Sequence, residues 1–282
     1  MHGIWELAVG TIVSRPYVFA FFAAYLLTAI PHLGWRKVAL FTPAGYLIAF
    51  LSEFCSINTG FPYGWYYYID RTSSQELWIA GVPFFDSLSY VFLCYCSYSV
   101  ALLILSPLKT NRHNFAILET HSIRQSFSAL LLGSLLQTYL DIIIDPVSLQ
   151  GERWFLGRIY GYCEKGCHFG VPISNYLGWW LTSALMIFAL QLLDRLVPEE
   201  QGFRRRYHRL PCSSLFGPSL YLSVIVFNLT IATIIGEQQI AVTGLFITFL
   251  PLTLVVILAI QRANSFSEAE LHHHLLEFAG RR

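Results

Sequence analysis

The sequence predicts an all-α protein, a polytopic membrane helix bundle with about seven transmembrane helices. Hydrophobic residues make up 55% of the 282 residues and charged residues only 12%, whereas an average soluble domain carries roughly 25% charged residues. The apolar residues form long runs along the whole chain instead of one anchor. Because runs of about 20 such residues can span a bilayer as helices, we expect a single integral membrane domain over residues 1–282.

Seven weakly charged segments have the length of membrane-spanning helices. They are residues 16–35, 37–57, 87–108, 125–144, 174–193, 215–235 and 240–260. The second segment contains Glu53 and the fourth contains Asp141, each near the end of its helix. We expect the fourth helix to end at Asp145, because Pro146 disfavours helical backbone at the residue before it.

The connections between these helices differ in character. Two long non-cytoplasmic loops, 58–83 and 145–173, are rich in Tyr, Trp, Phe, Gly and Pro. An aromatic belt at the membrane interface is one explanation of this composition. A polar loop at 194–214 and a C-terminal tail at 262–282 complete the chain.

The distribution of basic residues predicts a multi-pass protein of the cytoplasmic membrane, with its N-terminus outside and its C-terminus inside. In this orientation thirteen of the eighteen Lys and Arg residues fall in inner segments, where such residues are retained. Pro198 and the run from Arg204 to Arg206 form the expected cytoplasmic hinge. The net charge of +1 offers no basic field for nucleic acid, so nucleic acid is not an expected partner.

A partial internal repeat relates residues 45–108 to residues 130–193. Glu53 and Asp141 are 88 residues apart, and two Gly-Val-Pro triplets beginning at Gly81 and Gly170 are 89 apart. The Tyr-Gly elements that begin at Tyr63 and Tyr160 match less closely, at an offset of 97. The repeat predicts that the two acids lie at equivalent depths on the same side of the membrane.

Acids at membrane depth are the candidates for chemistry. An ionisable side chain inside a bilayer is costly, so it usually faces the bundle interior and serves a function. We therefore predict Glu53, Asp141 and Asp145 as catalytic residues, with Asp86 as a secondary candidate at a helix start. A structural pair for Glu53 and turn formation at Asp145 remain open alternatives. Desolvation keeps a carboxylic acid protonated near neutral pH, and aromatic faces stabilise a developing carbocation; together they favour protonation of a polyene.

Four stretches of the sequence resemble the carotenoid biosynthesis family that includes the bacterial and archaeal carotenoid 1,2-hydratases, the gamma-carotene and bisanhydrobacterioruberin hydratases. These stretches are EFCSINTGFPYGWYYY, GVPFFD, DIIIDPVS and GCHFGVPISNYLGWW, and the similarity spans roughly residues 45–190. The resemblance implies cofactor-free hydration of the terminal double bond of an acyclic carotenoid end group, which gives a tertiary alcohol. Expected partners are the acyclic carotenoid, the lipid bilayer and other enzymes of carotenoid biosynthesis.

The mechanism expected for these residues is acid-base catalysis. One acid protonates the alkene, and a second carboxylate then orients and deprotonates the water that attacks the cation. We assign Glu53 and Asp141 to these roles in either order, with Asp145 as the alternate. The residues expected to line the substrate site are Tyr63, Trp65, Tyr66, Asp86, Tyr160, Tyr162, Asn175 and Trp179.

The segment between Tyr160 and Gly170 departs from the family in its reactive side chains. Cys163, Cys167 and His168 fall short of a closed set of four metal ligands, so we expect no metal. An altered substrate and a solvent-facing loop insertion are both compatible with this segment.

Two other functions are compatible with parts of the sequence. A membrane lycopene-type cyclase also protonates a polyene, but Val197-Pro198-Glu199-Glu200 matches the Pro-x-Glu-Glu element of such cyclases only in part and lies in the expected cytoplasmic loop. A non-enzymatic lipid or isoprenoid transporter would account for the repeat. Transporters place ionisable groups near the midplane of the membrane, whereas these acids cluster toward one face.

Overall fold

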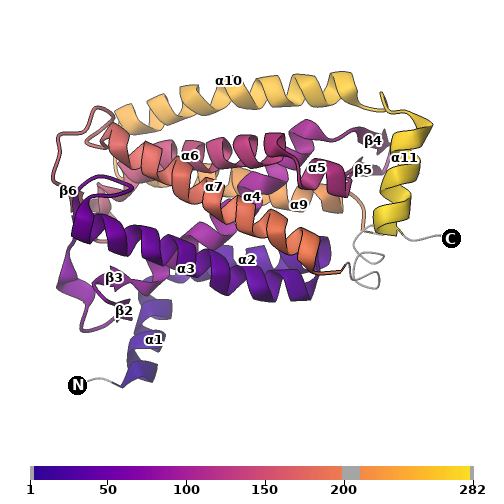
Figure 1. Cartoon of the computed structure of the whole chain (residues 1–282). Helices are drawn as coiled ribbons and strands as arrows, with labels where there is room; N and C mark the ends of the chain where they lie inside the picture. Colours follow the sequence, from indigo (N-terminus) through magenta and orange to yellow (C-terminus); the bar gives the residue numbers. More distant parts are fainter. Residues whose placement is uncertain (1–2, 199–209, 280–282) are drawn as a thin grey trace.

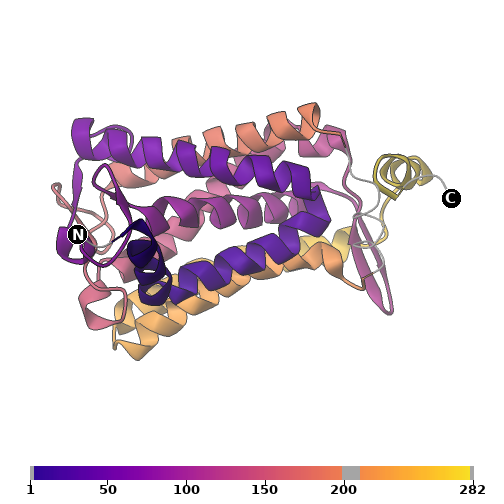
Figure 2. The same cartoon turned by 90° about the horizontal axis from the view of Figure 1, so that it is seen from below.

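The computed structural model describes residues 3–198 and 210–279, which form a bundle of long helices lying side by side (Figures 1 and 2). Seven of the described helices are long and apolar enough to cross a membrane. They are α2 (Pro16–Leu33), α3 (Trp35–Thr59), α4 (Phe84–Leu105), α6 (Phe127–Ser148), α7 (Ile173–Leu196), α9 (Phe216–Ile234) and α10 (Gln238–Arg262). The predicted class, an all-α polytopic helix bundle, is confirmed.

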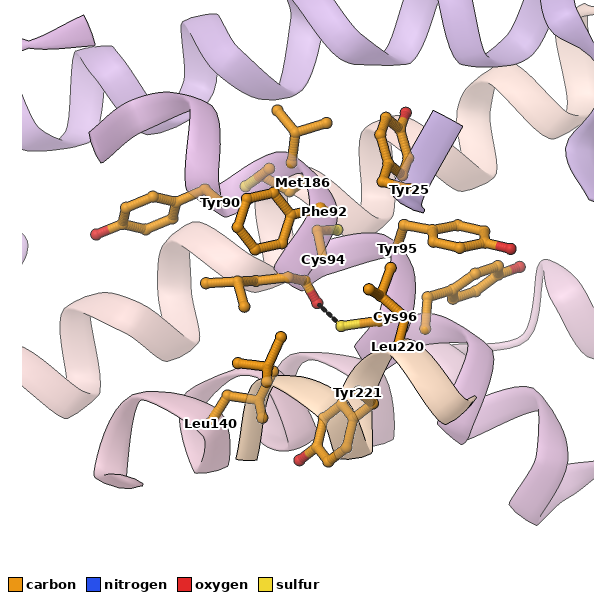
Figure 3. Close-up of a cluster of buried hydrophobic side chains, with 14 of the residues drawn as sticks. Tyr25, Tyr90, Phe92, Cys94, Tyr95, Cys96, Leu140, Met186, Leu220 and Tyr221 are labelled. Atoms are coloured by element: carbon orange, nitrogen blue, oxygen red, sulfur yellow. Dashed lines mark hydrogen bonds between the residues drawn. The ribbon is translucent and has the colours of Figure 1, made fainter. Parts of the chain in front are cut away.

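Helix α4 forms the centre of the bundle. It packs against α2, α3, α6, α7 and α9, and 78% of its most apolar stretch is buried, compared with 22% in α10. A helix buried on all sides needs apolar or small residues all round, and α4 supplies them. Figure 3 shows its residues Phe92, Cys94 and Cys96 packed among Leu140 of α6, Met186 of α7 and Leu220 and Tyr221 of α9.

The ends of the helices follow from local chemistry. Helix α3 ends at Gly60, whose φ of 78° is the left-handed conformation that glycine adopts readily after a helix. The Ser126 hydroxyl caps α6 by accepting from the Ala129 amide at 3.1 Å. Helix α4 ends at Leu105 because Ser106, which precedes a proline, is extended. This helix therefore occupies 84–105 instead of the expected 87–108, and Asp86 lies in its first turn.

Helix α6 continues through Pro146 to Ser148, so the prediction that it ends at Asp145 is wrong. A proline inside a helix removes the hydrogen bond to the carbonyl four residues earlier, which here belongs to Ile142. The Nε2 atom of His168 lies 3.2 Å from that carbonyl oxygen and replaces the missing donor. Asp141 and Asp145 consequently lie one turn apart on the same face of α6.

Short elements occupy both ends of the bundle and were not expected from the sequence. One end carries α1 (Ile4–Ser14), the hairpin of β2 (Trp78–Ile79) and β3 (Val82–Pro83), and the antiparallel pair of β1 (Tyr66–Tyr68) and β6 (Tyr160–Tyr162). The opposite end carries the hairpin of β4 (Leu108–Asn111) and β5 (Asn114–Ile117), α5 (His121–Arg124), α11 (Glu268–His274) and a π-helical turn (Leu275–Ala279). Figure 1 shows the N-terminus at the first end and the C-terminus at the second.

A cluster of buried charges holds the C-terminal end of the bundle together. Asp194 of α7 accepts from Nζ of Lys37 at 2.8 Å and from Arg124 at 3.3 Å. Glu119 accepts from Nε of Arg124 at 2.6 Å and lies 2.9 Å from Nε2 of His32. These contacts connect four separate parts of the chain. Glu199, Glu200 and the run Arg204 to Arg206 lie outside the described residues, and the orientation in the membrane stays a prediction.

Candidate functional site

A cavity of about 120 Å³ lies at the end of the bundle that carries β1 and β6. Its walls come from α2, α3, α4, α6, α7 and α9, and the two aromatic loops contribute the rest of the lining. Ten of the eleven residues expected at the site line this cavity. They are Glu53, Tyr63, Tyr66, Asp86, Asp141, Asp145, Tyr160, Tyr162, Asn175 and Trp179.

Trp65 is the exception, because its side chain is 48% exposed and does not line the cavity. It precedes β1, where successive side chains point to opposite faces, and Tyr66 takes the inward position. The indole ring instead covers Gly60, where an added Cβ would lie 2.7 Å from its Nε1 atom. Trp65 therefore does not line this cavity, unlike the other residues expected at the site.

The first pair of acids joins α3 to α4. Glu53 lies in the last two turns of α3 and is buried. The Tyr68 hydroxyl oxygen lies 2.7 Å from Oδ2 of Asp86 and 3.1 Å from Oε1 of Glu53. Ser87 donates to the other oxygen of Glu53. Sequence reasoning missed Tyr68, although the alternation of side chains along the strand would have placed it on the same face as Tyr66.

The second pair of acids lies on α6 and is bridged from α7. The amide nitrogen of Asn175 lies 2.8 Å from Oδ2 of Asp141 and 2.9 Å from Oδ2 of Asp145. Asp145 also accepts hydrogen bonds from the hydroxyls of Tyr160 and Tyr162. Asn175 thus holds both carboxyl groups at the cavity wall.

The pairing of β1 with β6 brings four tyrosines of distant loops together. Tyr66 pairs with Tyr162 and Tyr68 with Tyr160, and the centres of neighbouring rings lie between 5.3 and 6.4 Å apart. Burial, followed by the charge of the nearby carboxyl groups, raises the pKa of all four hydroxyls above its ordinary value. The tyrosines therefore stay protonated and act as hydrogen-bond donors at neutral pH.

Residues at equal distances after the two Gly-Val-Pro triplets meet in the cavity. Asp86 and Asn175 each follow the proline by three residues; Asp86 belongs to the first acid pair, and Asn175 donates to both acids of the second. Tyr90 and Trp179 each follow it by seven residues, and their rings stack at 4.1 Å with an interplanar angle of 8°. The two halves of the site are therefore built from matching positions, and Tyr90 was not foreseen.

The outer rim of the cavity is held by a buried ion pair. Arg15, at the junction of α1 and α2, lies 2.9 Å from Glu76 of the first aromatic loop. It also donates to the carbonyl of Leu156 in the second loop. The buried Asn228 of α9 also contributes a polar side chain to the lining, and no feature of the sequence had indicated that role.

No group of three or more His, Cys, Asp or Glu side chains among the described residues is arranged to hold a metal ion. Cys163 and Cys167 are exposed, and His168 contacts the Ile142 carbonyl. What the cavity gathers is carboxyl groups, hydroxyl donors and aromatic faces, a set suited to moving protons next to an apolar ligand.

The sequence of this chain was compared with models of known protein families. A family model described as "Carotenoid biosynthesis protein" matches residues 14–251. The chain belongs to this carotenoid biosynthesis family. The match includes every residue discussed above for the cavity, so the family relationship covers the candidate site as well as the bundle. No curated protein and no solved structure matches the chain.

Proposed function

We propose that this family member is a carotenoid 1,2-hydratase, which adds water to the terminal double bond of an acyclic carotenoid end group and forms a tertiary alcohol without a cofactor. One observation carries the proposal. Glu53 and the pair Asp141 and Asp145 face the same aromatic cavity from opposite helices. Hydration of an isolated alkene needs a proton donor, a stabilised cation and a positioned base, and this cavity offers a group for each.

The reaction proceeds through a tertiary cation. An acid of the cavity transfers its proton to the less substituted alkene carbon, and the positive charge develops on the carbon that bears the two methyl groups. The stacked rings of Tyr90 and Trp179 offer cation-π stabilisation, which reaches about 2 kcal/mol or more when water is excluded. A carboxylate then removes a proton from the attacking water. Glu53 takes one of these two roles, and the pair of Asp141 and Asp145 supplies the other.

The size of the cavity supports a substrate bound by one end. Its volume of about 120 Å³ is below the roughly 300–1,000 Å³ of pockets that enclose a whole small molecule. In this proposal the end group of the carotenoid occupies the cavity, and the conjugated chain extends beyond it. The orientation inferred from basic residues would place this end at the outer face of the cytoplasmic membrane.

Hydration accounts for more of the site than the two rival functions do. A cyclase needs a proton donor and a base but no site for water, whereas Asn175 and two carboxyl groups form a polar wall of the cavity that can bind a water molecule. A transporter of the repeat type would bind its ligand near the midplane, whereas this cavity lies at one end of the bundle. Glu199 and Glu200, the acids of the cyclase-like element, lie outside the described residues.

The test is expression in cells that accumulate lycopene or another acyclic carotenoid, followed by mass spectrometry of the pigments. We expect a product heavier by one water molecule for each hydrated end group. Glu53→Gln and Asp141→Asn should each abolish the product, because each removes an acid of the cavity while keeping its shape.

The matched control is Glu164→Gln, which alters an exposed acid of the second aromatic loop and should leave product formation unchanged. Membrane insertion of every variant is checked by immunoblotting of the membrane fraction. Unchanged pigment with several acyclic carotenoids would refute the hydratase, and a cyclised product of unchanged mass would favour the cyclase.

A further inference from the structure

The Tyr68 hydroxyl lies between Asp86 and Glu53 and cannot donate a hydrogen bond to both. It has one hydrogen, yet its oxygen lies 2.7 Å from Asp86 and 3.1 Å from Glu53. The Tyr66 hydroxyl, at 3.5 Å, approaches the same oxygen. If both carboxyl groups were ionised, one of these contacts would join two oxygens without a hydrogen between them. One of the two acids therefore carries a proton and donates it to Tyr68.

The position of each acid in its helix indicates which one is protonated. Asp86 lies in the first turn of α4, where the partial positive charge of the helix favours an ionised carboxylate. Glu53 lies near the carboxyl end of α3, where no such stabilisation exists. Ser87 donates to one oxygen of Glu53, which leaves the other oxygen, next to Tyr68, to carry the hydrogen. The chain of donors then runs from Glu53 to Tyr68 and on to Asp86.

Asp145, unlike Glu53, is surrounded by hydrogen-bond donors that favour its ionised form. Its two oxygens accept from Tyr160, Tyr162 and Asn175, and an ionised carboxylate is an acceptor only, with room for about four such bonds. A proton on Asp145 would face a hydroxyl that already donates. Asp145 lies near the end of α6, where the helix disfavours negative charge, but three hydrogen bonds to a charged group outweigh that effect.

We propose that Glu53 is the proton donor and Asp145 the base of this site, with Tyr68 as a positioning residue that holds the proton on Glu53. The assignment of chemical roles rests on the proposed hydratase function. The other titratable groups that line the cavity with these residues are Asp86, Asp141, Tyr17, Tyr63, Tyr90 and the four paired tyrosines, and Arg15 stacks on the ring of Phe85 at 4.4 Å beside them.

The catalytic cycle balances with these roles. Glu53 gives its proton to the alkene carbon, the alkene electron pair forms the new C–H bond, and Glu53 becomes a carboxylate. Water forms the C–O bond to the cation and loses a proton to Asp145. A proton then returns from Asp145 to Glu53, and the tyrosines of β1 and β6 lie between the two acids. No oxidant, reductant or further reactant enters the cycle.

The protonation states can be tested without any substrate by infrared difference spectroscopy of the purified protein in lipid vesicles. Glu53→Gln should remove a protonated carboxyl C=O band, and Asp145→Asn should remove a carboxylate band. Tyr68→Phe should shift or abolish the Glu53 band, because it removes the shared hydrogen bond. Tyr67→Phe is the matched control, since Tyr67 is a neighbour in the same strand, is 46% exposed and does not line the cavity. A carboxylate band lost in Glu53→Gln, or a protonated band lost in Asp145→Asn, would overturn the assignment.

The chemical roles can be tested by exchange in deuterated water. Asp145→Asn should stop hydration but still introduce deuterium into the recovered carotenoid, since Glu53 can protonate the alkene and take a proton back. Glu53→Gln should abolish both hydration and deuterium exchange, and Tyr68→Phe should lower the rate of each about 100-fold. Exchange that survives in Glu53→Gln and is lost in Asp145→Asn would reverse the roles. A wild-type protein that hydrates no acyclic carotenoid, yet gives the expected infrared bands, would refute the hydratase while leaving the protonation states intact.

Discussion

Asn175 is the residue on which the second acid pair depends. Its single amide group donates to both Asp141 and Asp145, and the two hydrogens of that amide allow one bond to each. Without it, two buried carboxyl groups one helical turn apart would face each other with fewer donors. The amide therefore holds the carboxyl groups of Asp141 and Asp145 in place and offers each of them a hydrogen-bond donor.

Replacement of this amide by a side chain of similar size should be costly. We expect Asn175→Leu to reduce product formation by about 100-fold or more and to lower the free energy of unfolding by about 1–3 kcal/mol, since buried carboxyl oxygens lose their donor. Product formed per amount of folded protein and thermal unfolding in detergent measure the two effects. Asn58→Leu, on an exposed position of α3, is the control. Full activity in Asn175→Leu would show that the bridge has no role in the reaction.

At the scale of single residues, the acids of the cavity could be predicted from the sequence, whereas the aromatic lining could be predicted only in part. Glu53, Asp141 and Asp145 were found because an acid in an apolar run is rare. Tyr68 was missed among the many tyrosines of the aromatic loops and Tyr90 among the tyrosines of α4; the pairing of β1 with β6 and the stacking on Trp179 distinguish these two. Their selection depends on contacts between segments far apart in the chain.

The first aromatic loop packs onto α7 through a close approach at Gly178. A Cβ added there would lie 2.5 Å from Cδ1 of Tyr63, 2.7 Å from its Cα and 2.8 Å from the carbonyl carbon of Pro62. Two of these atoms belong to the backbone, so the loop would have to move. Tyr63 donates to Thr182 of the same helix at 2.9 Å, and the movement would break this bond.

Gly178→Ala should therefore destabilise the loop and impair the site. We expect a loss of about 1–3 kcal/mol in the free energy of unfolding, as for overpacking in a core, together with reduced product formation. Gly133→Ala on α6 is the matched control, because its added Cβ would come close to the Cδ1 atom of Ile187 at 2.7 Å, the end of a flexible side chain, while Cα of Tyr98 and Cβ of Ala101 lie at the ordinary contact distances of 3.6 and 3.7 Å. Thermal unfolding and pigment analysis of both variants give the comparison. Equal effects in the two variants would contradict the importance of the loop contact.

The elements of the bundle were predicted to within a few residues because lipid requires long apolar helices. The prediction for the end of α6 failed because the rule for residues before proline is local, whereas His168 restores a donor from a distant loop. Strands of two to four residues and α1 were not foreseen, since they are too short to have a periodic pattern of their own. They are stabilised by the helices that they cover.

The buried acids at the two ends of the molecule are compensated by different groups. The cavity lining contains four acids and no Lys or Arg among the described residues, so protons and hydroxyl groups must compensate its charge. At the opposite end, Asp194 and Glu119 are compensated by Lys37, Arg124 and His32. A site that exchanges protons needs groups that can change charge, whereas a structural cluster needs groups that do not. The proton-exchanging cavity and the structural charge cluster therefore lie at opposite ends of the bundle.

This separation predicts that stability and catalysis can be altered independently. Asp194→Asn removes the negative charge shared by Lys37 and Arg124, and breaking a buried ion pair costs about 3–5 kcal/mol. Asp194 lies 19 residues after Asn175 along α7, or about 29 Å at the rise of an α-helix. We therefore expect a strongly lowered temperature of thermal unfolding, while the protein that remains folded forms product at the wild-type rate. Glu164→Gln, at an exposed acid, should change neither quantity. If Asp194→Asn stopped product formation in fully folded protein, the charge cluster would have to act on the cavity through the helices, and the two ends would form one functional unit.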